Sequence, residues 1–393
     1  MEIPLSQRVR RIKPSPTLAV TARAAELKAQ GVDVMSLGAG EPDFDTPAHI
    51  KEAAHQAIRD GFTKYTAVGG TPSLKQAVVD KMKRDNALDY QPGQVLVSNG
   101  GKQACYNLCQ ALLNDGDESI IPAPYWVSYP DMVLLAGGTP VILPTTAATR
   151  FKITPEQLER AITPRTRLFW INSPSNPSGM AYTHAELKAL GQVLRRHPQV
   201  VIATDDMYEK ILWAPEPFAN LVNVCPDLYH RTVVIHAVSK TYSMTGWRIG
   251  WACGPAPLIT AMADIQSQST SNPNSIAQVA AEAALNGPQD CVAEMCKAFR
   301  GRHDRLVAGL NAIPGVKCEP GDGTFYAFPS FEGLMQKLGC QDDLALAEVL
   351  LQKARVAAVP GSAFGAPGYL RLSFATSDRV LEESVARIRA LAG

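Results

Sequence analysis

Short apolar runs alternate with longer amphipathic stretches through the middle of the chain. The runs are rich in Val and Ile and alternate little between apolar and polar residues, which is typical of strands buried on both faces of a sheet. The stretches between them, such as 101–113 and 184–196, have the apolar spacing of helices. This order predicts an α/β fold with a mostly parallel sheet sandwiched by helices. The predicted strands are 95–98, 118–122, 139–144, 167–172, 200–206, 232–238 and 248–253.

A different pattern follows Asn272 and Pro273. It consists of long helical stretches and short apolar runs, in the order 275–312, 325–329, 356–361, 369–375 and 383–392. We therefore expect a smaller α+β domain, residues 276–393, beside a large domain, residues 46–275. Residues 1–45 contain a helical stretch at 17–30 but no sheet of their own, so we expect them to pack with the smaller domain.

The composition is that of a globular protein without a strong overall charge. Of the 393 residues, 46% are hydrophobic and 19% are charged, and the formal net charge is +1. No overall field therefore favours nucleic acid or a membrane surface, and a charged substrate has to be bound by local charges. The basic N-terminus lacks the apolar segment of a secretory signal, and no stretch reaches the roughly 20 apolar residues of a membrane helix. Eight cysteines without CxxC or zinc spacing predict reduced thiols in a cytoplasmic protein and no metal site.

Polar segments directly follow several of the predicted strands. Ligands bind beyond the carboxyl ends of the strands in open α/β sheets, so these segments form the candidate site. Together they would bring a glycine-rich turn, an Asn, an Asp, a Tyr, a Lys and an Arg to one place. The segments are SNGGKQ at 98–103, NSPSNPSG at 172–179, DDMYE at 205–209 and SKTYSMTGWRIG at 239–250.

Each candidate residue has a functional and a purely structural interpretation. Gly100 and Gly101 open a predicted helix whose free amides can bind a phosphate, or they form only a tight turn; the segment matches neither GxGxxG nor GxxxxGK[ST]. Lys240, desolvated at a strand end, can attack carbonyl groups, or it is a solvated loop lysine. Arg248 can hold a phosphate with its planar guanidinium, or it forms a surface ion pair. Asp205 can face a ligand, or it caps a helix.

The ordered series of motifs resembles the class I aminotransferases of fold type I, which use pyridoxal 5′-phosphate (PLP). More narrowly, it is similar to the bacterial aspartate aminotransferase subgroup that also contains prephenate aminotransferases. The resemblance extends over nearly the whole chain. The motifs are RIKPSPTLAVT (11–21), GEPDFDTP (40–47), KYTAVGG (64–70), GGKQA (100–104), PYWVSYP (124–130), NSPSNPSG (172–179), DDMYE (205–209), SKTYSMTGWRIG (239–250) and RLSFATS (371–377).

The resemblance implies a role around PLP for each matching residue. Lys240 holds the cofactor as a Schiff base and then moves a proton between the substrate Cα and C4′ of the cofactor. Asp205 pairs with the ring nitrogen, and its negative charge keeps that nitrogen protonated so that the ring withdraws electrons. Asn176 and Tyr208 contact the phenolic oxygen. Trp126 stacks on the ring face.

The resemblance also implies how the cofactor phosphate is bound. Tyr65 reaches the phosphate of the neighbouring subunit, which makes the active form a homodimer. Many relatives carry Ser or Thr three residues before the lysine, but this chain has Ala237 there. Either Ser239 supplies the missing hydroxyl, or the phosphate has one hydrogen bond fewer. The groups expected to hold the phosphate within one subunit are the backbone amides of Gly100, Gly101 and Lys102 and the side chain of Arg248.

Substrate binding follows from the same resemblance. Arg371 clamps the α-carboxylate in a bidentate pair, and Asn176 and the backbone at Gly40 complete that pocket. The side chain of Lys102 reads the distal carboxylate of aspartate or glutamate, unless its backbone alone matters and the ammonium is solvated. Lys13 assists a second carboxylate, such as that of prephenate.

These assignments imply a PLP-dependent aminotransferase with ping-pong kinetics. The expected donor is L-aspartate or L-glutamate, and the expected acceptor is 2-oxoglutarate or oxaloacetate. Prephenate or aromatic aminotransferase activity is one alternative, and a PLP-dependent β-lyase is another because the Arg371 clamp serves both reactions. A regulatory protein with a retained aminotransferase domain usually carries an added DNA-binding domain, for which the start of GEPDFDTP at residue 40 leaves no room.

Overall fold

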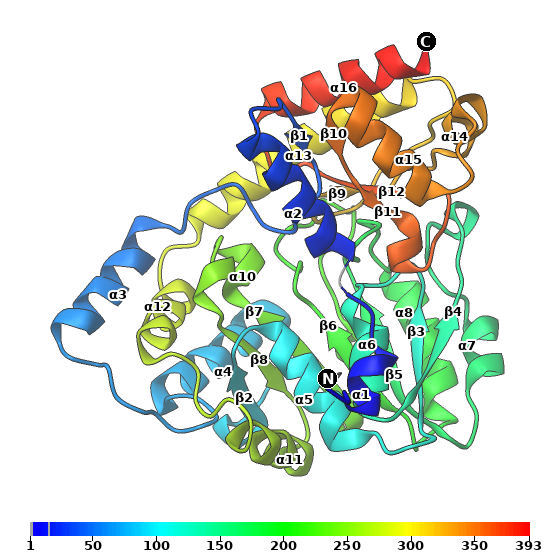
Figure 1. The fold of residues 1–393 in the computed structure, drawn as a ribbon. Helices are drawn as coiled ribbons and strands as arrows, with labels where there is room; N and C mark the ends of the chain where they lie inside the picture. Colours follow the sequence, from blue (N-terminus) through cyan, green and yellow to red (C-terminus); the bar gives the residue numbers. More distant parts are fainter. Residues whose placement is uncertain (1–2, 15) are drawn as a thin grey trace.

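The computed structural model describes residues 3–14 and 16–393, in which seven strands form one large sheet in the order β2-β8-β7-β6-β5-β3-β4 (Figure 1). β8 runs antiparallel to both of its neighbours, and the other pairs are parallel. The predicted strands and the mostly parallel sheet are thus confirmed. β8 begins two residues late because Arg248 has a positive φ of 58°, which a strand does not allow. The strands are β2 (Val95–Ser98), β3 (Glu118–Pro122), β4 (Thr139–Leu143), β5 (Thr166–Asn172), β6 (Val201–Asp205), β7 (Thr232–Ala237) and β8 (Gly250–Cys253).

Helices cover both faces of this sheet, as the apolar strands require. Along β5, Leu168 and Trp170 pack into the cluster on one face, whereas Phe169 and Ile171 pack into the cluster on the other. Alternate side chains of a strand point to opposite faces, so an uninterrupted apolar run buries both. The first face is covered by α5 (Gly101–Leu112), α6 (Ser128–Leu135) and α11 (Ala256–Ser267). The second face is covered by α7 (Pro155–Ala161), α8 (His184–Arg195), α9 (Leu221–Val224), α4 (Pro72–Asn86) and α12 (Ser275–Asn286), and α3 (Ala48–Arg59) packs on α12.

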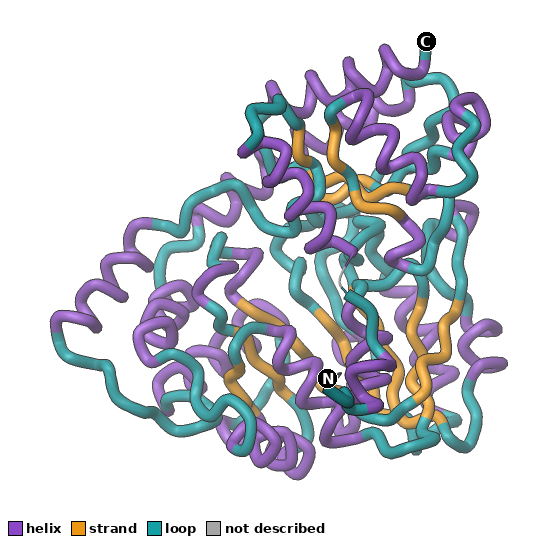
Figure 2. The backbone as a smooth tube through the Cα atoms, viewed as in Figure 1, coloured by secondary structure: helices purple, strands orange, loops and turns teal. Residues whose placement is uncertain are grey.

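A smaller group of strands lies beyond the large sheet (Figure 2). β9 (Tyr326–Ala327), β11 (Val359–Pro360) and β12 (Leu370–Ser373) form an antiparallel sheet. The helical stretch predicted at 275–312 is two helices, because Gly287 and Pro288 interrupt it and proline cannot continue a helix. The helices around this smaller sheet are α13 (Asp290–Asn311), α14 (Glu332–Leu338), α15 (Asp343–Val349) and α16 (Asp378–Ala392).

The N-terminal segment lies in two places. β1 (Met35–Ser36) pairs in parallel with β10 (Val356–Ala357), and α2 (Pro16–Ala29) contacts β10 and β11. α1 (Gln7–Arg11) instead lies against α6, one of the helices that cover the large sheet. The domain boundaries at residues 45 and 275 stay a prediction. Across residues 3–14 and 16–393, no helix has both the length and the apolar composition needed to cross a bilayer.

Candidate active site

A cavity of about 380 Å³ opens at the carboxyl ends of β5, β6 and β7, beside the smaller sheet. It collects residues that are up to about 330 positions apart in the sequence. Its volume lies within the range of small-molecule sites. The predicted site residues that line it are Gly40, Gly101, Lys102, Trp126, Asn176, Asp205, Tyr208, Ser239, Lys240, Arg248 and Arg371.

Lys240 and Asp205 face the same cavity from the ends of two neighbouring strands, β7 and β6. Asp205 ends β6, and Lys240 lies on α10 (Val238–Thr241), the single turn of helix that follows β7. Burial lowers the pKa of Lys240 to about 8, and the charge of Arg371 adds to this effect. The ammonium group donates a hydrogen bond to the carbonyl oxygen of Gly40. A lysine with this pKa has a much larger neutral, nucleophilic fraction at neutral pH than a solvated lysine.

The Asp205 carboxylate is almost fully buried. Burial raises its pKa to about 6, against hydrogen bonds from Tyr129 and the Met207 amide and the charge of Lys240, which lower it. The Asp205 side chain is therefore mostly ionised at neutral pH. Asn172 donates to the Asp205 carbonyl oxygen at 2.8 Å and fixes the end of the strand.

The turn before α5 lies directly against the Arg248 guanidinium. Gly100 has φ +79°, and a Cβ there would lie 2.4 Å from the Arg248 guanidinium. A Cβ on Gly250 would lie 2.4 Å from the Gly101 nitrogen, so both of these close approaches depend on glycine. Arg248 donates to the carbonyl of Thr245 at 2.9 Å. Free amides of the helix N-terminus and a guanidinium fork together suit a phosphate.

Arg371 is a buried cation without a carboxylate partner in the described part of the chain. Only 3% of its surface is exposed, and it lies on β12 of the smaller sheet. It donates to Asn176 Oδ1 at 3.0 Å and to the Gly38 carbonyl at 2.9 Å. Its guanidinium carbon lies 4.3 Å from the centre of the Tyr326 ring. A buried charge held by neutral groups alone is costly, so this position is suited to binding an anionic ligand.

Comparison with known proteins identifies the family. A model of the family described as aminotransferase class I and II matches residues 32–388. The chain belongs to this family. It is 61% identical to the aspartate/prephenate aminotransferase of Nitrosomonas europaea, over 98% of this chain and 99% of the relative.

Solved structures of aminotransferases have the same fold. The aspartate aminotransferase of Rhizobium meliloti is 46% identical with a TM-score of 0.95, and the two chains are covered to 100% and 99%. The aspartate aminotransferase of Thermus thermophilus with maleate is 43% identical with a TM-score of 0.94, with 99% and 100% coverage. The chain is thus a PLP-dependent aminotransferase of fold type I.

The cavity of this aminotransferase suits PLP. It offers an amine with a lowered pKa for the aldehyde, a buried carboxylate for the ring nitrogen and an anion site for the phosphate. The Tyr208 hydroxyl lies 3.2 Å from that of Tyr326, and burial, then Tyr326, raises the pKa of Tyr208, which keeps its proton for donation. Ser239 lines the cavity, whereas Ala237 is buried without a hydroxyl to offer.

Lys102 lines the cavity, whereas two further predicted residues, Lys13 and Tyr65, do not. The Lys102 ammonium lies 5.1 Å from the centre of the Trp126 ring at the cavity rim, and partial burial, then Arg248, lowers the pKa of Lys102. Lys13 is exposed and lies outside the cavity lining, where its backbone amide bonds to Asp131. Tyr65 is 94% exposed and does not line the cavity of its own chain. The roles of all three stay predictions.

Sequence reasoning missed several residues that complete the site. Tyr326, Met207, Glu41 and Thr245 line the cavity, and Tyr129 lies behind it. PYWVSYP contains Tyr129, but only the fold shows that its hydroxyl reaches Asp205. Tyr326 comes from the smaller sheet, so no local pattern could have placed it in this cavity.

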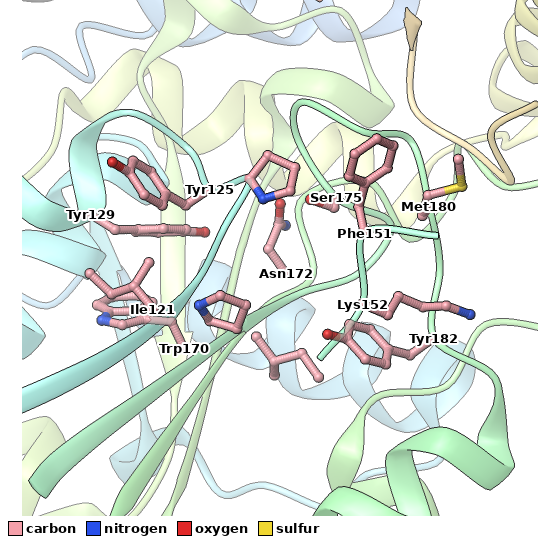
Figure 3. Close-up of a pocket in the computed structure, with 13 residues that line it drawn as sticks. Ile121, Tyr125, Tyr129, Phe151, Lys152, Trp170, Asn172, Ser175, Met180 and Tyr182 are labelled. Atoms are coloured by element: carbon pink, nitrogen blue, oxygen red, sulfur yellow. The ribbon is translucent and has the colours of Figure 1, made fainter. Parts of the chain in front are cut away.

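A second, much smaller cavity lies on the far side of Tyr129, lined also by Tyr125, Trp170 and Asn172 (Figure 3). Its volume of about 20 Å³ has room for about one water molecule. It therefore cannot accept PLP or an amino acid, and the cavity lined by Lys240 and Asp205 is the candidate active site.

Proposed function

We propose that this aminotransferase moves the amino group of L-aspartate or L-glutamate to 2-oxoglutarate or oxaloacetate. All four are dicarboxylates, and two cations of the cavity, Arg371 and Lys102, offer one partner for each carboxylate. The relatives support this choice, since they are named for aspartate or for aspartate and prephenate. The Thermus structure contains maleate, which is also a dicarboxylate.

The observation that carries the proposal is the presence of Lys240, Asp205 and Arg371 in one cavity. When bound, PLP supplies an aldehyde that condenses with amines and a ring that withdraws electrons from the substrate Cα. Arg371 binds the α-carboxylate and directs the Cα–H bond toward Lys240. Lys240, as a neutral amine, removes that proton and delivers it to C4′. Asp205 keeps the ring nitrogen protonated, and Tyr208 donates to the phenolic oxygen. Donor and acceptor use the same site in turn, which gives ping-pong kinetics.

Substitution of Lys102 tests the substrate assignment. Lys102→Gln keeps the backbone amide and removes the charge, so kcat/KM for oxaloacetate should fall about 10- to 100-fold, as expected for a hydrogen bond between charged groups. Phenylpyruvate lacks the distal carboxylate and is the matched control substrate, and its kcat/KM should change little. A wild-type preference for phenylpyruvate over oxaloacetate, or equal losses with both, would contradict the proposal.

Prephenate is a second candidate acceptor. The relative that is 61% identical is named for both aspartate and prephenate, and prephenate also carries two carboxylates. Lys13 would assist the second carboxylate, which requires the N-terminal segment to bring it from the surface to the cavity. Lys13→Gln should then lower kcat/KM for prephenate while oxaloacetate is unaffected. Equal values for the variant and the wild type would leave Lys13 without this role.

We further propose that the enzyme acts as a homodimer in the cytoplasm. Tyr65 is 94% exposed, and apolar side chains near it are also exposed, Ile58 at 53% and Phe62 at 40%. A partner subunit would cover this surface and receive Tyr65 in its own active site. All eight cysteines are free thiols, which agrees with a reducing compartment.

A further inference from the structure

Tyr129 contacts two residues of the active site without lining the cavity itself. It lies on α6 and is 2% exposed. Its hydroxyl donates to Asp205 Oδ2 at 2.5 Å, while Asp205 Oδ1 accepts the Met207 amide at 3.3 Å. Both carboxylate oxygens therefore have a donor from the protein, and the side chain is held in one orientation. The Tyr129 bond is the shorter of the two.

The Tyr129 ring is fixed by aromatic neighbours. It stacks on Trp170 at a centroid distance of 4.5 Å and an angle of 23°. It meets Trp126 edge to face at 5.3 Å and 86°. Trp126 and Asp205 both line the cavity. One buried tyrosine thus contacts the two side chains that would meet the face and the nitrogen of the cofactor ring.

We propose that Tyr129 is a positioning residue that holds the Asp205 carboxylate in line with the ring nitrogen of PLP. This inference rests on the proposed placement of the cofactor in the cavity. Tyr129 acts through Asp205 and touches neither substrate nor cofactor.

The charges around the carboxylate agree with this role. Burial, then the charge of Asp205, raises the pKa of Tyr129, so the phenol keeps its proton and remains the donor. The hydrogen bond lowers the pKa of Asp205 and stabilises the ionised carboxylate. The other titratable groups facing Asp205 are Lys240 from α10, Cys105 from α5 and Tyr208 from the turn after β6. Of these, only the ammonium of Lys240 stabilises its negative charge.

Tyr129→Phe tests the inference because it removes the hydroxyl and keeps the stacked ring. The dissociation constant of PLP, measured by titrating the cofactor-free protein, should rise about 10- to 100-fold, the range for a hydrogen bond to a charged group. With a cofactor analogue that has CH in place of the ring nitrogen, the wild type and the variant should bind equally well. The turnover kcat should fall while KM for aspartate changes little, because the substrate is bound by other residues.

Tyr125→Phe is the matched control. Tyr125 lies beside Tyr129 and lines the small cavity, not the active site (Figure 3). Its substitution should leave both dissociation constants unchanged. If Tyr129→Phe binds PLP as tightly as the wild type, or loses the same factor with both cofactors, the inference is wrong. A wild-type protein that neither binds PLP nor reacts with aspartate would instead refute the proposed function.

Discussion

The titration of Lys240 should be measurable in the reaction of the cofactor-free protein with PLP, without any substrate. The aldehyde of PLP is attacked by the neutral amine, and burial and Arg371 lower the pKa of Lys240 to about 8. The rate of imine formation in cofactor-free protein should therefore rise about tenfold per pH unit below 8 and level off above it. Stopped-flow absorbance after mixing with excess PLP measures this rate. An unperturbed lysine would level off only near pH 10.4.

Arg371 provides a second test of the same titration. Removal of a nearby positive charge makes the ammonium form more favourable, so Arg371→Met should move the levelling point of the rate profile to higher pH. The substitution also removes the proposed α-carboxylate partner, and KM for aspartate should rise. A profile that stays at pH 8 in this variant would show that burial alone sets the pKa of Lys240.

The turn after β6 illustrates how secondary-structure elements are anchored behind the site. Glu209 ends the segment DDMYE and pairs with Lys81 of α4 at 2.5 Å, each with a side chain 2% exposed. Asn86 donates to the second carboxylate oxygen at 2.7 Å. Although burial opposes it, the charges of Lys81 and His236 hold the pKa of Glu209 well below its ordinary value of 4.5. Because the folded pKa is depressed, the pair stabilises the fold fully above about pH 4.5 and loses this contribution at lower pH.

Removal of one member of this pair should be costly. Glu209→Gln leaves the Lys81 ammonium buried and unpaired, so the free energy of unfolding should fall by about 3–5 kcal/mol. The double variant Lys81→Met, Glu209→Gln removes both charges and should be less destabilised than the single variant. Urea unfolding of the cofactor-free proteins at pH 7 measures both. A double variant that is destabilised as much as Glu209→Gln, or more, would show that the unpaired Lys81 ammonium is not the cause of the loss.

Elements could be predicted from this sequence wherever one local pattern decides them. The run at 118–122, which contains Ile120 and Ile121, is strand β3 with the same bounds, because it is buried and pairs on both sides. The single helical stretch predicted at 275–312 covers both α12 and α13, since both have helical spacing and only Gly287 and Pro288 signal the interruption. Tyr326 could not be placed at all, because its position depends on how the smaller sheet meets the larger one. Resemblance to a family predicts that Arg371 and Asn176 share one pocket. Their hydrogen bond of 3.0 Å could not be predicted from local sequence, because it depends on the fold.

At the scale of the whole molecule, the site is assembled from three parts of the chain. The large sheet contributes Asp205 at the end of β6 and Lys240 on α10 after β7, the smaller sheet contributes Arg371, and the N-terminal segment contributes Gly40. A change in the relative position of these parts would alter the cavity without breaking any strand. The 94% exposed Tyr65 suggests a fourth contribution, from a partner subunit.

Hybrid dimers test that contribution. Consider a dimer with Lys240→Ala in one subunit and Tyr65→Phe in the other, purified with two affinity tags. If Tyr65 acts across the interface, one of the two sites is intact, and the hybrid should bind about one PLP per dimer with wild-type affinity. The matched control carries both substitutions in one subunit beside a wild-type partner; its site with Lys240 then lacks Tyr65, so no site should have wild-type affinity. If Tyr65 acts within its own subunit, the two results are exchanged, and if no hybrid can be isolated, the homodimer itself is wrong.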